Sequence, residues 1–318
     1  MPDLAARFTI GDVLKTQGLS GDEDPAALCL AIARSRRENF PVLSLAVPAR
    51  LRAGMAAVYA FCRLVDDLGD EAEGDRRGLL DAWEEDLLLV WNGEPRHPVL
   101  RALIPHVRSL DLPPDPFRRL VRANRMDQAR SRWGTFDDLL DYCRHSAAPV
   151  GRMVLLLHGF RDEDRFRRSD AVCTALQLAN FWQDVGRDLR DRGRIYLPQE
   201  DLDRFGVPEA ALSAPSASPA LRKLIAFEAG RTRRLFVEGL GLTDLLEGRL
   251  RWAVSAFCAG GLSVLDALAA RQYDPLMGRP EPASKTRVLA GTLWRLSLGA
   301  KGPAVCPSSL RSDGAEAP

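Results

Sequence analysis

Two segments of the sequence place oxygen-bearing side chains one helical turn apart. In the first, residues 59–70, Asp66 and Asp70 are four positions apart. On a helix of about 3.6 residues per turn, this spacing brings both carboxylates to one face. Stacked carboxylates repel each other unless a cation lies between them. The same spacing also occurs on solvated acidic helices, so this segment alone leaves both interpretations open.

The second segment, residues 177–188, carries a longer polar stripe. Gln177, Asn180, Asp184 and Asp188 recur at intervals of three or four residues, while leucine and aromatic residues flank them. The flanking residues predict a largely buried helix, in which such a stripe is costly unless it faces a polar cavity or a metal. Hard oxygen donors without cysteine or clustered histidine favour Mg²⁺ over zinc. The two segments together predict facing helices that bind Mg²⁺ and, through it, a diphosphate.

Three further side chains are placed to assist such a site. Arg63 precedes Asp66 by about one turn, and Tyr59 precedes Arg63 by another. Arg194 follows the second stripe closely and could reach a phosphate oxygen as the helix ends. A surface arginine that interacts with the dipole at the helix C-terminus accounts equally well for Arg194.

The elements that must position these residues are predicted to be helices. Apolar residues recur at three- and four-residue spacing, Pro and Gly fall between the blocks, and no segment alternates in the manner of a strand. The expected helical blocks are residues 51–68, 79–91, 117–126, 136–143, 150–160, 166–189, 221–240, 250–268 and 288–296. Thr135 is a candidate N-cap, with Asp137 and Asp138 in the first turn after it. We therefore expect an all-α, single-domain protein with a loose N-terminal arm at 1–24, a catalytic domain at 25–298 and a disordered tail at 299–318.

Composition narrows the class of protein. The chain has 318 residues, of which 46% are hydrophobic, and its 44 basic and 43 acidic residues nearly cancel. This balance gives no sign of a nucleic-acid partner. The six cysteines form no metal-ligand spacing and no disulfide framework, which favours a reducing compartment. Without a signal peptide or an apolar run of membrane-spanning length, we expect a soluble, cytoplasmic protein.

Residues 25–298 resemble the squalene/phytoene synthase family. The resemblance is carried by YAFCRLVDDLGD at 59–70, LQLANFWQDVGRD at 176–188 and GRIYLP at 193–198. It implies the isoprenoid synthase fold, with a central cavity between the two Asp-rich helices and a prenyl diphosphate as substrate. It also implies the following site: metal ligands Asp66, Asp70, Asn180, Asp184 and Asp188, with Tyr59, Arg63 and Gln177 at the diphosphate end.

Three stretches are similar to one branch of this family, the hopanoid-pathway hydroxysqualene synthases: 37–42, 142–152 and 180–184. That branch converts presqualene diphosphate and water into hydroxysqualene, which implies no need for NADPH. Arg37 and Asn39 are the substrate-binding candidates in the first stretch. Squalene synthases that run both steps carry a tyrosine close to the position of Arg144 and His145, and this chain has none at these two positions. Ala148 departs from the branch, in which asparagine is expected.

Two other interpretations stay open. The chain could be a head-to-head prenyl transferase that makes presqualene diphosphate, squalene or phytoene from two allylic diphosphates. It could also be a non-catalytic family member that acts as a scaffold, although such a member should have lost part of its acidic stripes. The hydroxysqualene interpretation implies functional pairing with a presqualene diphosphate synthase. Its apolar product leaves open a peripheral contact with the inner membrane face.

Overall fold

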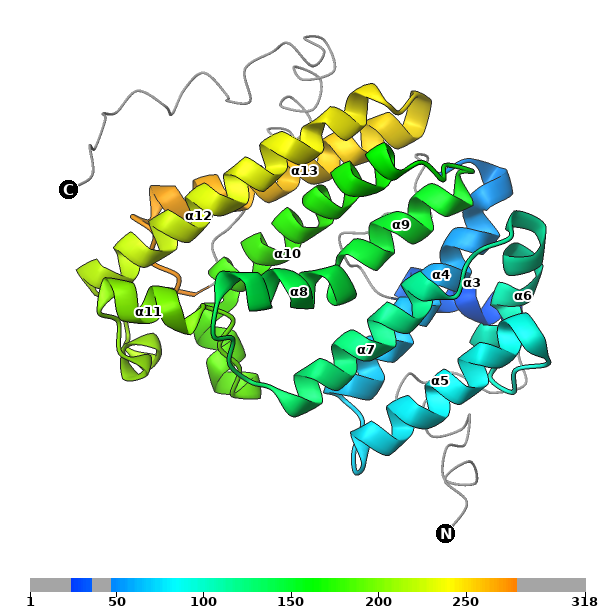
Figure 1. Cartoon of the computed structure of the whole chain (residues 1–318), viewed down its shortest axis with the longest axis horizontal. Coiled ribbons are helices and arrows are strands. Elements are labelled where there is room, and N and C mark those ends of the chain that lie inside the picture. The colour runs from blue at the N-terminus through cyan, green and yellow to red at the C-terminus, as the bar shows by residue number, and fades with distance from the viewer. Residues whose placement is uncertain (1–23, 36–46, 279–318) are drawn as a thin grey trace.

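The computed structural model describes residues 24–35 and 47–278, and within these ranges the chain is built from helices (Figure 1). The α-helices are α3 (Pro25–Ser35), α4 (Arg52–Asp70), α5 (Arg76–Asn92), α6 (Pro98–Leu110), α7 (Asp115–Ala129), α8 (Phe136–Ser146), α9 (Ala148–Leu157), α10 (Glu163–Arg192), α11 (Gln199–Phe205), α12 (Pro219–Leu240) and α13 (Gly248–Ala270). Three short 3₁₀ helices are η1 (Ala49–Leu51), η2 (Glu209–Ser213) and η3 (Gly241–Asp244). The only β pairing in the described ranges is a single bridge between Arg132 and Ile195. The prediction of an all-α fold is confirmed.

Helical periodicity located most of these elements but did not delimit α3, α6 and α11. Helix α6 begins at Pro98 and contains Pro105 within it, which obscures the apolar pattern. Helix α11 has only seven residues, too few for a period to show. The predicted arm at 1–24, except for Asp24, the predicted block at 288–296 and the predicted tail at 299–318 lie outside the described residues.

The buried apolar side chains form two main clusters. The first draws on α3 to α7 and the C-terminal half of α9, and the second on α8 and α10 to α13. Helix α7 belongs to both, because Val121 packs in the first cluster and Ala123 in the second. Helix α9 also packs against both α4 and α10. The two polar stripes therefore lie on helices of different clusters, which α7 and α9 join.

Helices α4, α7 and α10 run in the same direction through the molecule (Figure 1). At one end, the first turns of α7 and α10 meet, since Asp115 and Phe166 line one pocket. At the other end, the last residue of α4, Asp70, forms an ion pair with the last residue of α10, Arg192. The parallel course brings the C-terminal, polar parts of all three helices to the same end of the molecule.

One described helix, α13, has the length and apolar composition that a membrane span requires. It packs against α10 and α12, and a third of its most apolar window is buried. A helix that packs in a protein core passes the same test of length and composition.

Candidate active site

Asp66 and Asp70 lie on one face of helix α4, as their spacing predicts. Asp66 is accessible to solvent, yet desolvation raises its pKa to about 7, an effect that Asn124 opposes and Asp70 reinforces. Asp66 is therefore exposed to solvent, while the protein groups packed around it still disfavour the carboxylate anion.

The stripe on α10 is partly buried. Asp184 and Asp188 are buried, whereas Asn180 is exposed and accepts a hydrogen bond from Gln183 at 3.4 Å. Desolvation and the neighbouring Asp184 raise the pKa of Asp188 to about 6. Asp184 forms an ion pair of 2.9 Å with Arg187. Both acidic helices therefore hold carboxylates that like charge and burial disfavour as anions, which is the condition that a bound cation relieves.

Arginines after α10 connect it to α4. Helix α10 stops at Gly193, whose φ of 64° is the left-handed conformation that favours glycine. Arg194 Nη1 then lies 2.9 Å from one oxygen of Asp70, and Arg192 Nη1 lies 3.1 Å from the other. Arg194 is 6% exposed. Its guanidinium was predicted to meet a phosphate oxygen or to lie on the surface; in the structure it is buried against the first acidic helix.

The segment that carries Arg194 is fixed by the loop between α7 and α8. Ile195 N donates to Ser131 O at 3.0 Å, and Arg132 Nη1 donates to Gly193 O at 2.6 Å. The ring of Tyr196 stacks on Phe181, with centroids 3.7 Å apart and planes at 7°. Backbone pairing and ring stacking thus hold Arg194 in place.

Helix α7 supplies a third polar stripe that sequence reasoning did not assign to the site. Asn124 Nδ2 lies 3.4 Å from Asp66 Oδ1, and Gln128 Nε2 donates to Gly69 O at 2.8 Å. Asp127 Oδ2 accepts from the hydroxyl of Tyr142 at 2.6 Å. Desolvation raises the pKa of Asp127 to about 6, although Arg194 and Tyr142 oppose that rise. Asp127 and Gln128 follow Asn124 by three and four residues, so the helical period contained the signal.

The donor set suits Mg²⁺ bound together with a phosphate ligand. Within the described residues, no three Asp, Glu, His or Cys side chains lie close enough together to hold a metal ion by themselves. Mg²⁺ usually takes only one or two carboxylates and completes its shell with water and substrate phosphates. Asp66 with Asp70, and Asp184 with Asp188 and the amide of Asn180, could each provide such a partial shell.

The other predicted site residues differ in how the structure places them. Tyr59 is half-buried beside the first apolar cluster, and Gln177 is half-buried on α10. Arg63 lies along its own helix, 2.7 Å from Asp67 and 3.1 Å from Glu71. Arg37 and Asn39 lie outside the described residues. The capping of α8 is confirmed, because Thr135 and Asp138 form a reciprocal capping box.

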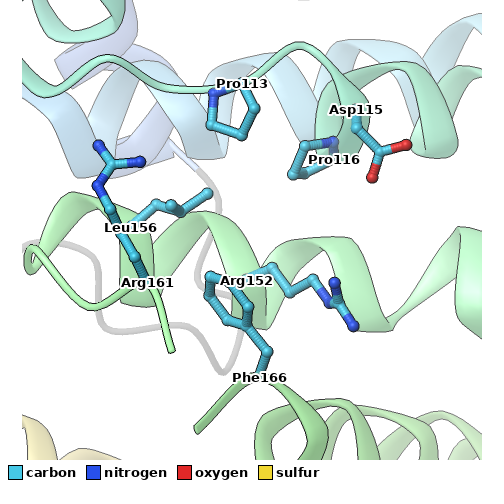
Figure 2. Close-up of a pocket in the computed structure, with 7 residues that line it drawn as sticks. All are labelled: Pro113, Asp115, Pro116, Arg152, Leu156, Arg161 and Phe166. Atoms are coloured by element: carbon cyan, nitrogen blue, oxygen red, sulfur yellow. The ribbon is translucent and has the colours of Figure 1, made fainter. Parts of the chain in front are cut away.

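A separate pocket of about 170 Å³ lies at the opposite end of α7 and α10 (Figure 2). Its lining residues are Pro113, Asp115, Pro116, Arg152, Leu156, Arg161 and Phe166. Arg152 forms a bidentate pair with Asp170, and Arg161 donates to Leu110 O. From Phe166 to Asp184 the helix rises about 27 Å at roughly 1.5 Å per residue. This pocket is not part of the acidic site.

Comparison with known proteins agrees with this architecture. The sequence profile of the family described as squalene/phytoene synthase matches residues 33–291. The chain belongs to the squalene/phytoene synthase family, and its fold is that of this family's isoprenoid synthases.

Individual relatives carry different names. A hydroxysqualene synthase from Rhodopseudomonas palustris is 36% identical over 248 residues, which cover 77% of this chain and 83% of the relative. A phytoene synthase from Arthrospira platensis is 32% identical over 266 residues, which cover 79% and 86%. The crystal structure of squalene synthase HpnC from Alicyclobacillus acidocaldarius superposes with a TM-score of 0.75 at 46% identity, covering 78% of this chain and 94% of that one. The predicted similarity to the hydroxysqualene synthase branch is confirmed, because hydroxysqualene synthases are among the relatives of this chain.

Proposed function

We propose that the protein is a Mg²⁺-dependent enzyme that converts presqualene diphosphate and water into hydroxysqualene and diphosphate. The observation that carries the proposal is the convergence of the acidic ends of α4 and α10 on Arg192 and Arg194. Carboxylates that can hold Mg²⁺ and guanidinium groups that can hold phosphate oxygens meet there. The choice of reaction is supported by the hydroxysqualene synthases among the relatives, at 34 to 36% identity.

In this reaction, the C–O bond of presqualene diphosphate breaks and its electron pair leaves with the diphosphate. Bound Mg²⁺ supplies Lewis-acid stabilisation of that leaving group. Arg194 and Arg192 add charge-assisted hydrogen bonds where negative charge builds up. Water then forms the new C–O bond and loses a proton, so atoms and charge balance without a reductant. We accordingly propose that NADPH is not used.

The positions of Arg144 and His145 bear on the choice between the two enzymatic interpretations. Arg144 is exposed beside Asp141, and His145 Nδ1 lies 2.9 Å from Asp141 O, to which it can donate. Neither offers the phenol that family members running the first condensation carry nearby. The phytoene synthase relative favours the second candidate, head-to-head condensation of two allylic diphosphates. We propose a cytoplasmic location, with peripheral membrane contact for release of the apolar product.

Product analysis tests the proposal. Purified protein with Mg²⁺ would receive presqualene diphosphate or farnesyl diphosphate, each with and without NADPH, and products would be identified by gas chromatography and mass spectrometry. Hydroxysqualene from presqualene diphosphate, in equal yield with and without NADPH, is expected. Presqualene diphosphate or squalene formed from farnesyl diphosphate would replace the proposal with the second candidate, and no turnover of any prenyl diphosphate would favour a scaffold.

Asp66→Asn and Asp184→Asn should each lower turnover by about 100-fold or more, because each removes a charge that the metal requires. Asp170→Asn is a matched control, since Asp170 pairs with Arg152 far from the site. Circular dichroism should show the same helix content in all three variants. Turnover unchanged in both site variants would refute the metal assignment.

A further inference from the structure

Asp127 on α7 is surrounded by groups that hold it in one position. Its Oδ2 accepts from the Tyr142 hydroxyl at 2.6 Å and lies 3.6 Å from Arg194 Nη1. Its Oδ1 lies 3.5 Å from the hydroxyl of Tyr196. The side chains of Asp127 and Arg194 are each 8% exposed. Asp127 is therefore a buried carboxylate with a partner near each oxygen, whereas Asp66 is exposed.

The two tyrosines are themselves fixed by packing. The ring centroid of Trp133 lies 5.3 Å from that of Tyr142 and 4.6 Å from that of Tyr196. Phe181 of α10 stacks on Tyr196 from the other side. Side chains with few rotatable bonds, packed in this way, keep a hydrogen-bonded carboxylate in one place at little further entropic cost.

Arg194 thus has two carboxylate partners with different surroundings. Asp70, 2.9 Å away, belongs to the proposed metal-binding stripe of α4. Asp127, at 3.6 Å, belongs to the aromatic cluster. A divalent cation on Asp70 competes for the same oxygens and repels the guanidinium. A buried arginine without a carboxylate is strongly disfavoured, so Arg194 needs Asp127 once the metal has bound.

We propose that Asp127 is a positioning residue, which keeps Arg194 directed at the diphosphate after the metal takes Asp70. The inference rests on the proposed function for the identity of the ligand. Asp127 acts through Arg194 and does not itself touch the substrate. Tyr142 and Tyr196 support it by fixing the carboxylate.

The test measures binding of inorganic pyrophosphate in the presence of Mg²⁺, by isothermal titration calorimetry on the full chain. Asp127→Asn keeps the size of the side chain and removes its charge. It should weaken pyrophosphate binding by about 10- to 100-fold, as loss of a supporting partner behind a ligand-binding group usually does. Asp170→Asn, which removes a carboxylate from the Arg152 pair at the other end of α10, should leave the affinity unchanged.

A double-mutant cycle separates positioning from a general loss of structure. If Asp127 acts through Arg194, then Asp127→Asn should cause no further loss of affinity in an Arg194→Gln background. Tyr142→Phe keeps the charge pair and loosens the carboxylate, so it should give a smaller loss with the same non-additivity; it also serves as the second variant if Asp127→Asn does not fold. Equal affinities of Asp127→Asn and Asp170→Asn, or additive losses with Arg194→Gln, would overturn the inference.

Pyrophosphate binding and turnover, measured on the same proteins, distinguish failure of this inference from failure of the proposed function. Pyrophosphate binding that depends on Asp127, in a protein that turns over no prenyl diphosphate, supports the positioning role and refutes the proposed reaction. Turnover of presqualene diphosphate with an Asp127→Asn variant as active as wild type refutes the positioning role alone. Absence of Mg²⁺-dependent pyrophosphate binding in the wild-type protein also refutes it.

Discussion

Gly69 sets how closely α7 can approach the acidic face of α4. A Cβ at this position would lie 2.1 Å from Asn124 Oδ1 and 2.9 Å from its Cγ. Asn124 is buried there, with Nδ2 3.2 Å from Leu120 O as well as near Asp66. The glycine therefore costs helix propensity in α4 but makes room for an amide between two helices.

Gly69→Ala should displace Asn124 and, with it, the support for Asp66. We expect turnover to fall by about tenfold, as for loss of a hydrogen-bond partner of a metal ligand, the role proposed for Asp66, and the unfolding temperature to fall as well. Activity and thermal unfolding, measured on the same preparation, check the prediction.

Gly230 of α12 provides the control, because a Cβ there would meet no atom within 4 Å. Gly230→Ala should raise the free energy of unfolding by up to about 1 kcal/mol through helix propensity and leave turnover unchanged. If Gly69→Ala behaved as Gly230→Ala does, the close approach of Asn124 would have no functional role.

At the scale of elements, α11 and α12 are joined by a buried charged cluster. Arg231 Nη1 lies 2.6 Å from Asp201 Oδ2 and 3.2 Å from Glu228 Oε1, and its guanidinium lies over the rings of Phe136 and Phe227. Glu228 is fully buried. The neighbouring carboxylate of Asp201 raises the pKa of Glu228, because its negative charge and a hydrogen bond between the two carboxyl groups both favour the neutral form.

This cluster predicts a pH dependence of stability. Desolvation raises the pKa of Glu228 from 4.5 to about 8, against the opposing effect of Arg231. Between pH 4.5 and pH 8, the folded state therefore keeps a proton on Glu228 that the unfolded state has lost. The stability that this proton contributes is fully present below pH 4.5 and is lost as the pH rises towards 8. Over that window, the free energy of unfolding of the wild-type protein should fall relative to Glu228→Gln, by at most about 1.4 kcal/mol per pH unit.

Urea unfolding of both proteins between pH 5 and pH 8 measures this difference. Glu238→Gln, on the same helix but at an exposed pair with Arg167, is the matched control. Its stability difference from wild type should not change with pH in this way. A constant difference between wild type and Glu228→Gln over the same range would contradict the assignment of a neutral Glu228 in the folded protein.

At the scale of the whole molecule, the proposed ligand would join two apolar clusters. Helix α4 belongs to one and α10 to the other, and α7 and α9 form the contacts between them. A cation–diphosphate complex held by both acidic stripes must therefore stabilise both halves together. Ligands that bind only the folded state increase its stability by mass action.

Hydrogen exchange measured by mass spectrometry should show this coupling. With Mg²⁺ and pyrophosphate together, the backbone amides of residues 59–70 and 177–188 should both become more protected. Mg²⁺ alone or pyrophosphate alone should give less protection, because Mg²⁺ needs the phosphate oxygens to complete its coordination shell. The amides around the Arg152–Asp170 pair serve as an internal control, and protection of only one acidic helix would contradict a shared site.

The sequence by itself determined the class of fold and the two acidic faces. The helical period is a local property of the chain. Once their segments were helical, Asp66 necessarily shared a face with Asp70, and Asn180 shared one with Asp184 and Asp188. Tertiary structure decided which groups meet between helices. Arg194 and Asp70 are 124 positions apart in the chain, and Tyr142 and Asp127 meet only because the loop between α7 and α8 brings the two helices together. No local pattern encodes such contacts, because they depend on how whole helices pack and not on the spacing of residues along any one of them.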